Sequence, residues 1–221
     1  MGKEARDHIL AVFKAGVSAV PVVGGTIASL IGDYIPTATE RTVRESIDIL
    51  SKRIEELGDR IDDECVNKDE FSELFKSCYL IMVRTHKEKK IRGAIELICN
   101  ILLKKDDADK LNYTEIDHFM RCLDALSIGA IEVLGHVVAV ASAMHRERVG
   151  VENVRMAFAD VQNRVPQIEP DLLMSLLGEL NSFHLVFVNP TPGVRTVSYQ
   201  NSPVELPPIG ARFAKYILQI R

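Results

Sequence analysis

Two pairs of side chains in this sequence have the spacing of metal ligands. His118 and Cys122 lie four residues apart, and so do Glu132 and His136. Within a helix each pair would share one face, which is the minimum geometry for two zinc ligands. Neither pair has a third ligand that the sequence places beside it, and the chain has no H-E-x-x-H or C-x-x-C motif. We therefore expect a structural role for these residues and predict no metal or other cofactor.

Motifs for phosphate binding and for nucleophilic catalysis are also missing. The glycines of residues 23–26 are not followed by the lysine of a P-loop, and no predicted strand precedes them. A G-x-S-x-G sequence is absent. The carboxylates of Asp59, Asp62, Asp63 and Glu64 lack the glycine-punctuated spacing of a calcium loop. The sequence thus predicts no catalytic residues and a protein that is not an enzyme.

Composition and charge point to a globular protein without the usual features of a nucleic-acid binder. The chain has 221 residues, is 47% hydrophobic and carries a formal net charge of −4. Residues 1–112 hold 18 Lys and Arg against 20 Asp and Glu, and residues 113–221 hold 9 against 11. Neither half has the basic excess that binding to a phosphate backbone normally needs. No cleavable signal peptide is apparent, and four scattered cysteines indicate buried, reduced thiols in a cytoplasmic protein.

An uncharged stretch near the N-terminus is the most distinctive segment of the chain. Eighteen residues between Lys14 and Asp33 carry no charge, and a proline and two adjacent glycines interrupt them. Small residues recur at every fourth position on both sides of this break, so two helical arms could approach closely. We predict a tight helical hairpin within residues 1–36, packed against the protein or inserted into a membrane. Its packing or membrane-contacting residues are Ala15, Gly16, Ala19, Pro21, Gly24, Gly25, Ala28 and Gly32.

A heptad-like seam follows and predicts one long amphipathic helix. Its apolar positions alternate steps of four and three and comprise Val43, Ile47, Leu50, Ile54, Leu57 and Ile61. The seam is short for a free-standing coiled coil, so packing into a helical bundle over residues 37–110 is favoured over homomeric pairing. Either arrangement makes these residues an interaction seam.

A basic run separates two further apolar helices of this bundle. Its cations are Lys87, Lys89, Lys90 and Arg92. Such runs are most often solvated, and contact with an anionic lipid or a nucleic acid is the alternative. The charged segment 104–110 (KKDDADK) then reads as a linker and as the boundary before a domain over residues 111–221.

The C-terminal domain is predicted to combine helices with one short β-hairpin. Ser127 has the position of a cap for an apolar helix, and Asp171 has that of a cap for a second helix, LLMSLLGEL. Between them, the apolar residues of 151–161 predict another helical face. Two β-rich runs around a Pro/Gly turn predict a hairpin over about residues 183–200, before a last helix.

The fold class expected from these segments is mainly α. A helical hairpin and a helical bundle come first, and a winged-helix-like module with one short β-hairpin follows. The runs LDALSIGAIEVLGHV, LLMSLLGELNSFHLVFV and VELPPIGARFAKYI, with RTHKEKKIRGAIELICNILL upstream, resemble the abortive-infection Abi-alpha-like proteins over most of residues 40–221. The resemblance implies a bacterial cytoplasmic protein with phage defence as its context. It brings no catalytic residues to this chain.

Three functions compete at this point. The first is a non-catalytic interaction or scaffold protein that binds protein partners or itself. The second is an effector, cytoplasmic or peripheral to the inner membrane, whose N-terminal hairpin inserts into lipid on activation. The third, a winged-helix DNA-binding regulator, is disfavoured because residues 171–180 contain an Asp, a Glu and no Lys or Arg, which makes nucleic acid an improbable partner.

Overall fold

The computed structural model describes residues 35–62, 69–85, 87–188 and 199–218. Within these ranges the protein is mainly helical and carries a small three-stranded antiparallel sheet. The chain divides into two compact units, Met1–Asp124 and Ala125–Arg221. The helical hairpin predicted within residues 1–36, with all eight of its named residues, lies outside the described residues.

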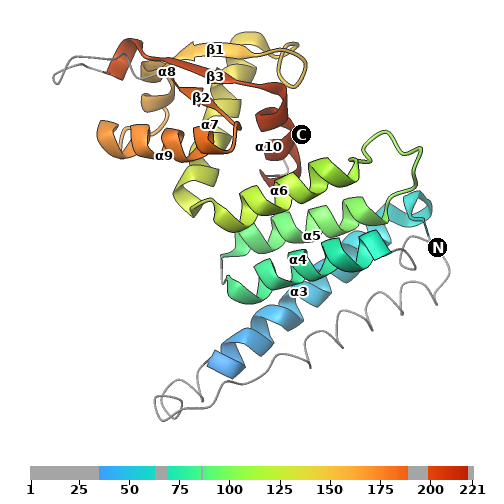
Figure 1. Cartoon of the computed structure of the whole chain (residues 1–221). Coiled ribbons are helices and arrows are strands. Elements are labelled where there is room, and N and C mark those ends of the chain that lie inside the picture. Colours follow the sequence, from blue (N-terminus) through green and yellow to red (C-terminus); the bar gives the residue numbers. More distant parts are fainter. Residues whose placement is uncertain (1–34, 63–68, 86, 189–198, 219–221) are drawn as a thin grey trace. The chain divides into compact units, whose positions relative to one another are not determined.

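The first unit is a bundle of helices arranged around α5 (Figure 1). Its elements are α3 (Ile35–Leu57), the 3-10 turn η1 (Gly58–Arg60), α4 (Asp69–Arg84), α5 (Glu88–Leu102) and α6 (Tyr113–Ala125). Helix α5 packs against both α3 and α4. Its apolar residues from Ile91 to Leu102 are buried on almost every side, so α5 forms the core of the unit.

The heptad-like seam lies inside this unit, but the helix that was expected to carry all of it ends at Leu57. Ile61 follows η1 and pairs with Leu103 in an isolated bridge. The described side chains of the seam, Leu50, Ile54, Leu57 and Ile61, are all buried. Val43 and Ile47 belong to α3, but their side chains lie outside the described part of the chain. The four buried residues contribute to the protein's own core, and they are not exposed for pairing with another chain.

The second unit wraps helices and a sheet around the apolar helix α7. Its elements are α7 (Ile128–His145), β1 (Val154–Ala157), α8 (Phe158–Gln162), α9 (Pro170–Ser182), β2 (Phe187–Val188), the 3-10 turn η3 (Tyr199–Asn201), β3 (Pro203–Leu206) and α10 (Pro208–Leu218). Strand β3 pairs antiparallel with β1 on one side and with β2 on the other. Helix α7 contacts α9, α10, α8, β1 and β3.

Helix α7 would also satisfy a search for membrane-spanning segments. Among the described residues it is the one helix long and apolar enough to cross a membrane by length and composition. Its buried residues are Ala130, Ile131, Val133, Leu134, Val137, Val138, Val140 and Ala141. As predicted, Ser127 is its N-cap, and the Ser127 side chain accepts a hydrogen bond from the Ala130 amide. The packing around α7 is that of a core helix.

The prediction of a helical face over residues 151–161 was wrong in its first half. Residues Val154–Ala157 form strand β1, and helix α8 starts only at Phe158. Val154 and Met156 are buried while Arg155 is exposed, which is the alternation of a half-buried strand. Pairing with β3, distant in sequence, decides between strand and helix for this short segment.

The prediction of one β-hairpin over about residues 183–200 also needs correction. Strand β2 contains Phe187 and Val188 alone, and its partner is β3, with Phe187 opposite Glu205 and Val188 opposite Val204. Residues 189–198 lie outside the described part of the chain. The prolines at positions 203, 207 and 208 are more typical of a loop than of a strand. Pro203, however, occupies the first position of β3, where proline is tolerated.

The start of α9 differs from its prediction by two residues. Asp171 was expected to cap the helix, but the N-cap is Glu169 and Pro170 takes the first helical position. Proline fits there because its fixed φ suits the helix and the missing N–H would have no intrahelical partner. Asp171 therefore lies in the first turn, where a carboxylate is favourable to the helix dipole.

Helix α10 packs against the end of the segment that precedes β2, and Gly210 permits this contact. A Cβ atom at position 210 would lie 1.9 Å from the backbone oxygen of Leu185. No rotamer change relieves an overlap with a carbonyl group. Gly178 on α9 is the opposite case, because a Cβ there meets nothing within 4 Å.

We predict that Gly210→Ala lowers the free energy of unfolding by about 3 kcal/mol or more, at or beyond the upper end for overpacked sites. Gly178→Ala is the matched control and is expected to raise the stability by up to about 1 kcal/mol, because alanine is the better helix former. Urea unfolding followed by circular dichroism measures both. Equal stability of the two variants would contradict the close packing of α10 on Leu185.

Candidate interaction surfaces

The two sequence pairs with ligand spacing do not build a metal site. On α6, His118 Nε2 lies 3.6 Å from Cys122 Sγ. Burial raises the pKa of Cys122 to about 12, so its thiol is neutral and a poor nucleophile or ligand. On α7, Glu132 is exposed and His136 is half-buried. The described residues contain no group of three or more His, Cys, Asp or Glu side chains that could hold a metal ion.

The other described cysteines are core residues. Cys78 and Cys99 are buried, and desolvation raises the pKa of both thiols. The Cys78 Sγ lies 3.1 Å from the Met120 Sδ, to which the thiol donates a weak hydrogen bond between α4 and α6. Cys65 lies outside the described residues. These thiols pack as small apolar groups.

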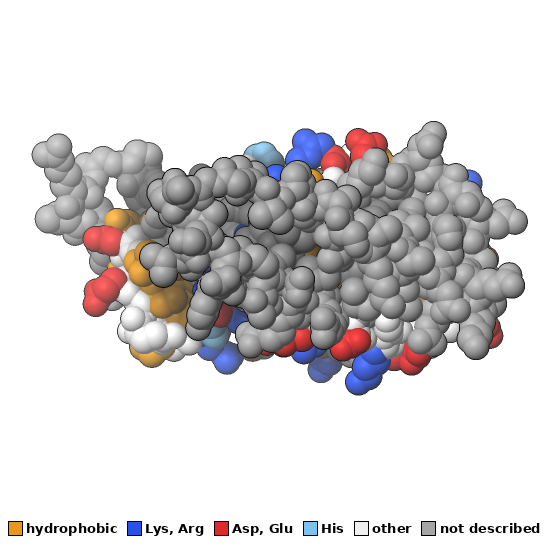
Figure 2. Space-filling view, turned by 90° about the horizontal axis from the view of Figure 1, so that it is seen from below, with side chains coloured by type: hydrophobic (Ala, Val, Ile, Leu, Met, Phe, Trp, Pro, Cys, Tyr) orange, Lys and Arg blue, Asp and Glu red, His pale blue; other side chains and the backbone are white. Residues whose placement is uncertain are grey.

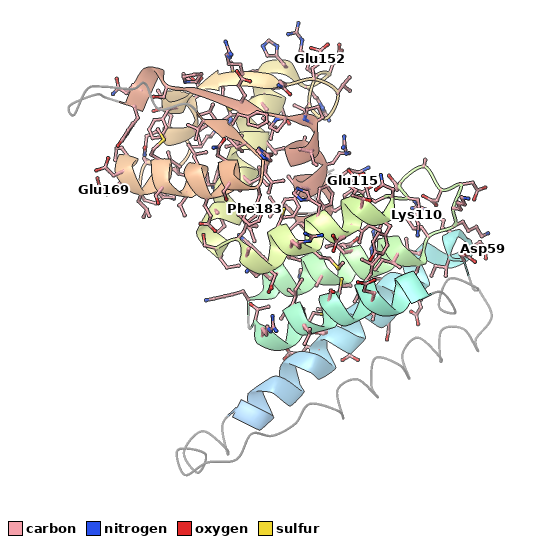
Figure 3. The ribbon with its side chains drawn as sticks, viewed as in Figure 1. Asp59, Lys110, Glu115, Glu152, Glu169 and Phe183 are labelled. Atoms are coloured by element: carbon pink, nitrogen blue, oxygen red, sulfur yellow. The ribbon has the colours of Figure 1, made fainter. Side chains whose placement is uncertain are left out.

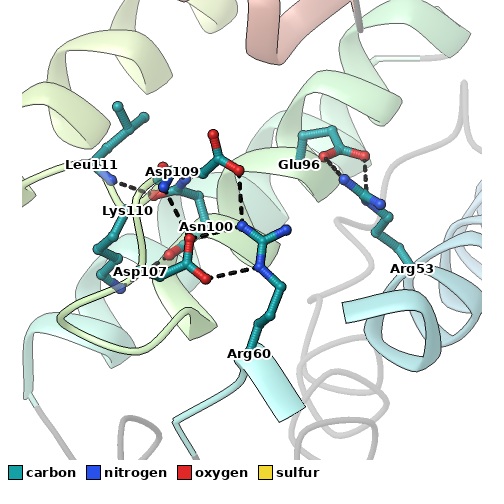
Figure 4. Close-up of polar contacts among 8 residues, drawn as sticks. All are labelled: Arg53, Arg60, Glu96, Asn100, Asp107, Asp109, Lys110 and Leu111. Carbon is teal, nitrogen blue, oxygen red and sulfur yellow. Dashed lines mark hydrogen bonds and ion pairs between the residues drawn. The ribbon is translucent and has the colours of Figure 1, made fainter. Parts of the chain in front are cut away.

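A network of ion pairs fastens the charged segment 104–110 to Arg60 of η1, the 3-10 turn that follows α3 (Figure 4). Arg60 donates from Nε to Asp107 Oδ2 at 2.8 Å and from Nη2 to Asp107 Oδ1 at 2.7 Å. The same Nη2 donates to Asp109 Oδ2 at 2.8 Å. Because the guanidinium fork matches the carboxylate, the pair fixes orientation as well as distance. The Arg60 guanidinium thereby holds the pKa of Asp107 at about 2, below its ordinary value.

Asn100 and Lys110 fasten the same segment to the end of α5. The Asn100 side chain is buried; its Nδ2 donates to the Asp109 carbonyl at 2.8 Å, and its Oδ1 accepts from the Leu111 amide at 2.9 Å. Lys110 Nζ donates to the carbonyls of Asn100 and Ile101 in the last turn of α5, where the Asn100 carbonyl also accepts from the amide of the C-cap residue Leu103. The sequence predicts that segment 104–110 is a linker between domains. In the structure, Arg60 ties this segment to η1, and Asn100 and Lys110 tie it to the end of α5. The two compact units divide elsewhere, between Asp124 and Ala125.

The basic run lies where α4 ends and α5 begins. Lys87 and Lys89 are exposed. Lys90 Nζ donates to the Asp124 carbonyl at 2.8 Å, and Arg92 forms an ion pair with Glu88 at 2.8 Å. Lys90 therefore contacts the end of α6, whereas Lys87 and Lys89 are exposed to solvent. All four cations named from the sequence lie at the N-cap or in the first two turns of α5.

The second candidate surface is the outward face of α9. Leu173, Leu177 and Leu180 are buried on the inner face of this helix. The outer face exposes Leu172, whose residue surface is 54% accessible, with Ser175 and Gly178. Glu169 and Phe183 mark the two ends of α9 in Figure 3. Figure 2 shows hydrophobic side chains beside acidic ones on part of the face that it displays.

The two carboxylates of α9 are engaged within the second unit. Glu179 accepts hydrogen bonds from the amide and the hydroxyl of Ser127, the N-cap of α7. Tyr199 donates its hydroxyl to Asp171, and this hydrogen bond raises the pKa of Tyr199. Both contacts fix the rotation of α9 about its own axis, so the helix presents one defined face to solvent. Sequence reasoning missed this, because the partners are 52 and 28 residues away.

Comparisons of the chain with protein-family models, with curated proteins and with solved structures gave no match. The described residues present two candidate interaction surfaces. One is basic and belongs to the first unit. The other lacks cations and belongs to the second.

We predict that Asp107→Asn destabilises the first unit at pH 7. The pKa of Asp107 in the folded state lies below that of an unfolded chain, so its stabilisation is present above about pH 4 and is lost as the pH falls towards 2. The difference between the wild type and the variant should therefore shrink over that window. Urea unfolding at several pH values measures it, with Asp106→Asn, an exposed neighbour, as the control. A difference that is independent of pH would contradict the ion-pair assignment.

Proposed function

We propose that this protein is a non-catalytic interaction module whose winged-helix-like second unit binds a protein partner through α9. The exposed, cation-free face of α9 is the observation that carries the proposal. Three features of the described residues support it: the order of the elements, the charge of α9 and the exposed leucine at its first turn.

The order of elements in the second unit supports a winged-helix-like module. It runs helix, strand, helix, helix, strand, strand, from α7 to β3, and the last strand lies between the other two in the sheet. In this arrangement α9 has the position of the recognition helix of a helix-turn-helix protein. The segment 189–198 between β2 and β3 has the sequence position of a wing.

The charge of α9 disfavours DNA as its ligand. A recognition helix enters a groove between two rows of phosphates, and its affinity depends on Lys and Arg side chains. Helix α9 has the sequence PDLLMSLLGELNS, with two carboxylates and no cation. Its approach to a phosphate backbone would bring like charges together, so binding to DNA through this face is unfavourable.

The same face suits contact with another protein. Leu172 is largely exposed, although burial of a leucine side chain is worth about 2 kcal/mol. Ser175 lies three residues further on the same face, and the open space at Gly178 lets a partner's side chains come close to the helix backbone. An exposed leucine beside a small residue on the same helix face can serve as an anchor for an apolar pocket.

The biological setting proposed here follows from the resemblance to abortive-infection proteins. We place the module in a bacterial cytoplasm, as a scaffold in phage defence. The effector model, in which the N-terminal hairpin inserts into lipid, remains the second candidate from sequence. Its hairpin lies outside the described residues, so the proposal rests on the second unit instead.

We predict that a photo-crosslinking amino acid at position 172 gives a discrete adduct with one host protein, and that an equivalent probe at position 151 does not. With that partner purified, Leu172→Asp should weaken binding at least about tenfold, since an anchor residue would be replaced by a charge. Val151→Asp is the matched control because Val151 is an exposed apolar residue of the same unit. Circular dichroism verifies that both variants are folded.

Retention of duplex DNA tests the competing regulator. At physiological salt we expect no retention of DNA by the intact chain, and a salt-dependent shift that Leu172→Asp weakens would overturn the proposal in favour of DNA binding. Unchanged affinity of Leu172→Asp for the captured partner would also contradict a role of α9.

A further inference from the structure

The turn between α4 and α5 collects the strongest basic charge density of the described chain. Residues 84–92 contain five Lys or Arg residues and one acidic residue, in a chain with a net charge of −4. The turn lies at one end of the helices of the first unit (Figure 1). The Arg84 side chain is 64% accessible and the Arg92 side chain 45%, and Lys87 and Lys89 are exposed. These cations therefore face solvent at one corner of the unit, which we call the basic corner.

The ion pairs that Arg84 and Arg92 make at this corner are exposed. Arg92 pairs with Glu88, whose own side chain is 72% accessible. Arg84 Nη1 lies 3.7 Å from Asp124 Oδ2, which is long for an ion pair, and the Arg84 side chain is 64% accessible. Exposed pairs of this kind are weak and are easily exchanged for other partners. The cations of Arg84 and Arg92 are thus still available to an anionic surface.

An exposed leucine adjoins the cations. Leu80 is 46% accessible, whereas Cys78, Ile81 and Met82 on the same helix are buried. It precedes Arg84 by four residues, so both side chains lie on one face of α4. Leu80 is among the few large apolar residues that are exposed in the described part of the chain. The corner consequently offers an aliphatic side chain together with positive charge.

We propose that the basic corner, with Leu80, binds an anionic lipid surface. Lipid phosphates complement the cations of residues 84–92, and the boundary between headgroups and acyl chains accommodates a leucine next to them. A nucleic acid would use the cations but offers nothing to an aliphatic side chain. The inference is independent of the proposed function, because it concerns the first unit and requires neither α9 nor the N-terminal hairpin.

Flotation of the full chain with vesicles tests the inference. One set of vesicles contains phosphatidylglycerol and the other only phosphatidylcholine, and each is measured at low and high salt. We expect association with the anionic vesicles alone, and we expect high salt to weaken it because salt screens exposed charges. Leu80→Ser should lower the affinity at both salt concentrations, since an uncharged contact is not screened.

The deciding variant is the double substitution Lys87→Glu/Lys89→Glu. Both positions lie at the start of α5, where acidic side chains suit the helix dipole, so the fold should be kept. We expect its affinity for anionic vesicles to fall at least about tenfold. The matched control, Lys104→Glu/Lys105→Glu, makes the same change in charge at two exposed lysines of the same unit and should leave the affinity within about twofold.

Several outcomes would overturn the inference. Equal flotation with both kinds of vesicle would show that another segment inserts into lipid without regard to charge. Equal losses of vesicle affinity in the two double variants would show that binding depends on the net charge of the protein and not on the basic corner. No flotation with anionic vesicles at low salt, with retention of nucleic acid or of an acidic peptide instead, would assign the corner to a different partner.

Discussion

Burial of one strongly apolar helix in each unit is the constraint on which the rest of the structure depends. Helix α5 in the first unit buries residues on most of its sides, and α7 in the second buries one broad apolar face between Ala130 and Ala141. Neither helix could be left in water, so the surrounding elements must turn their apolar faces towards it. For α9 this requirement directs Leu173, Leu177 and Leu180 inward. Leu172 and Ser175 are left on the outside as a consequence.

Polar contacts then fix the orientation of α9 and the position of segment 104–110, which the burial of apolar side chains alone does not determine. The carboxylate of Glu179 ties α9 to the cap of α7, and the Arg60–Asp107 pair ties the segment 104–110 to η1. Many charges of this chain therefore serve internal order, and burial keeps the described thiols neutral. Two surfaces expose side chains to solvent: the outer face of α9 with Leu172, and the basic corner with Leu80 and Lys87. Their chemistries differ, since one is apolar without cations and the other is basic.

Local patterns in the sequence predicted those parts of the fold that local physics determines. The Ser127 cap depends on a hydrogen bond between near neighbours, and the helical spans follow from apolar spacing, so both could be read directly. Strands β1 and β3 could not, because two strands of four residues become stable only through pairing across about fifty positions. The contacts of Asn100 with the segment 104–110 were missed because a charged run looks like a solvated linker until its partners are known. Of the candidate surfaces, the basic run was visible in the sequence, whereas the exposure of Leu172 depends on how α9 is rotated.

Hydrogen exchange of the intact chain tests the central claim that α7 is the core helix of the second unit and that α9 therefore has one fixed outer face. The amides of residues 130–141 combine helical hydrogen bonds with burial, so we expect them to be the slowest of the second unit and to exchange only on its global unfolding. Exchange of these amides as fast as in the exposed turn over residues 146–149 would contradict the account. In that case α7 would not be the core, and the outward face of α9 would lose its basis.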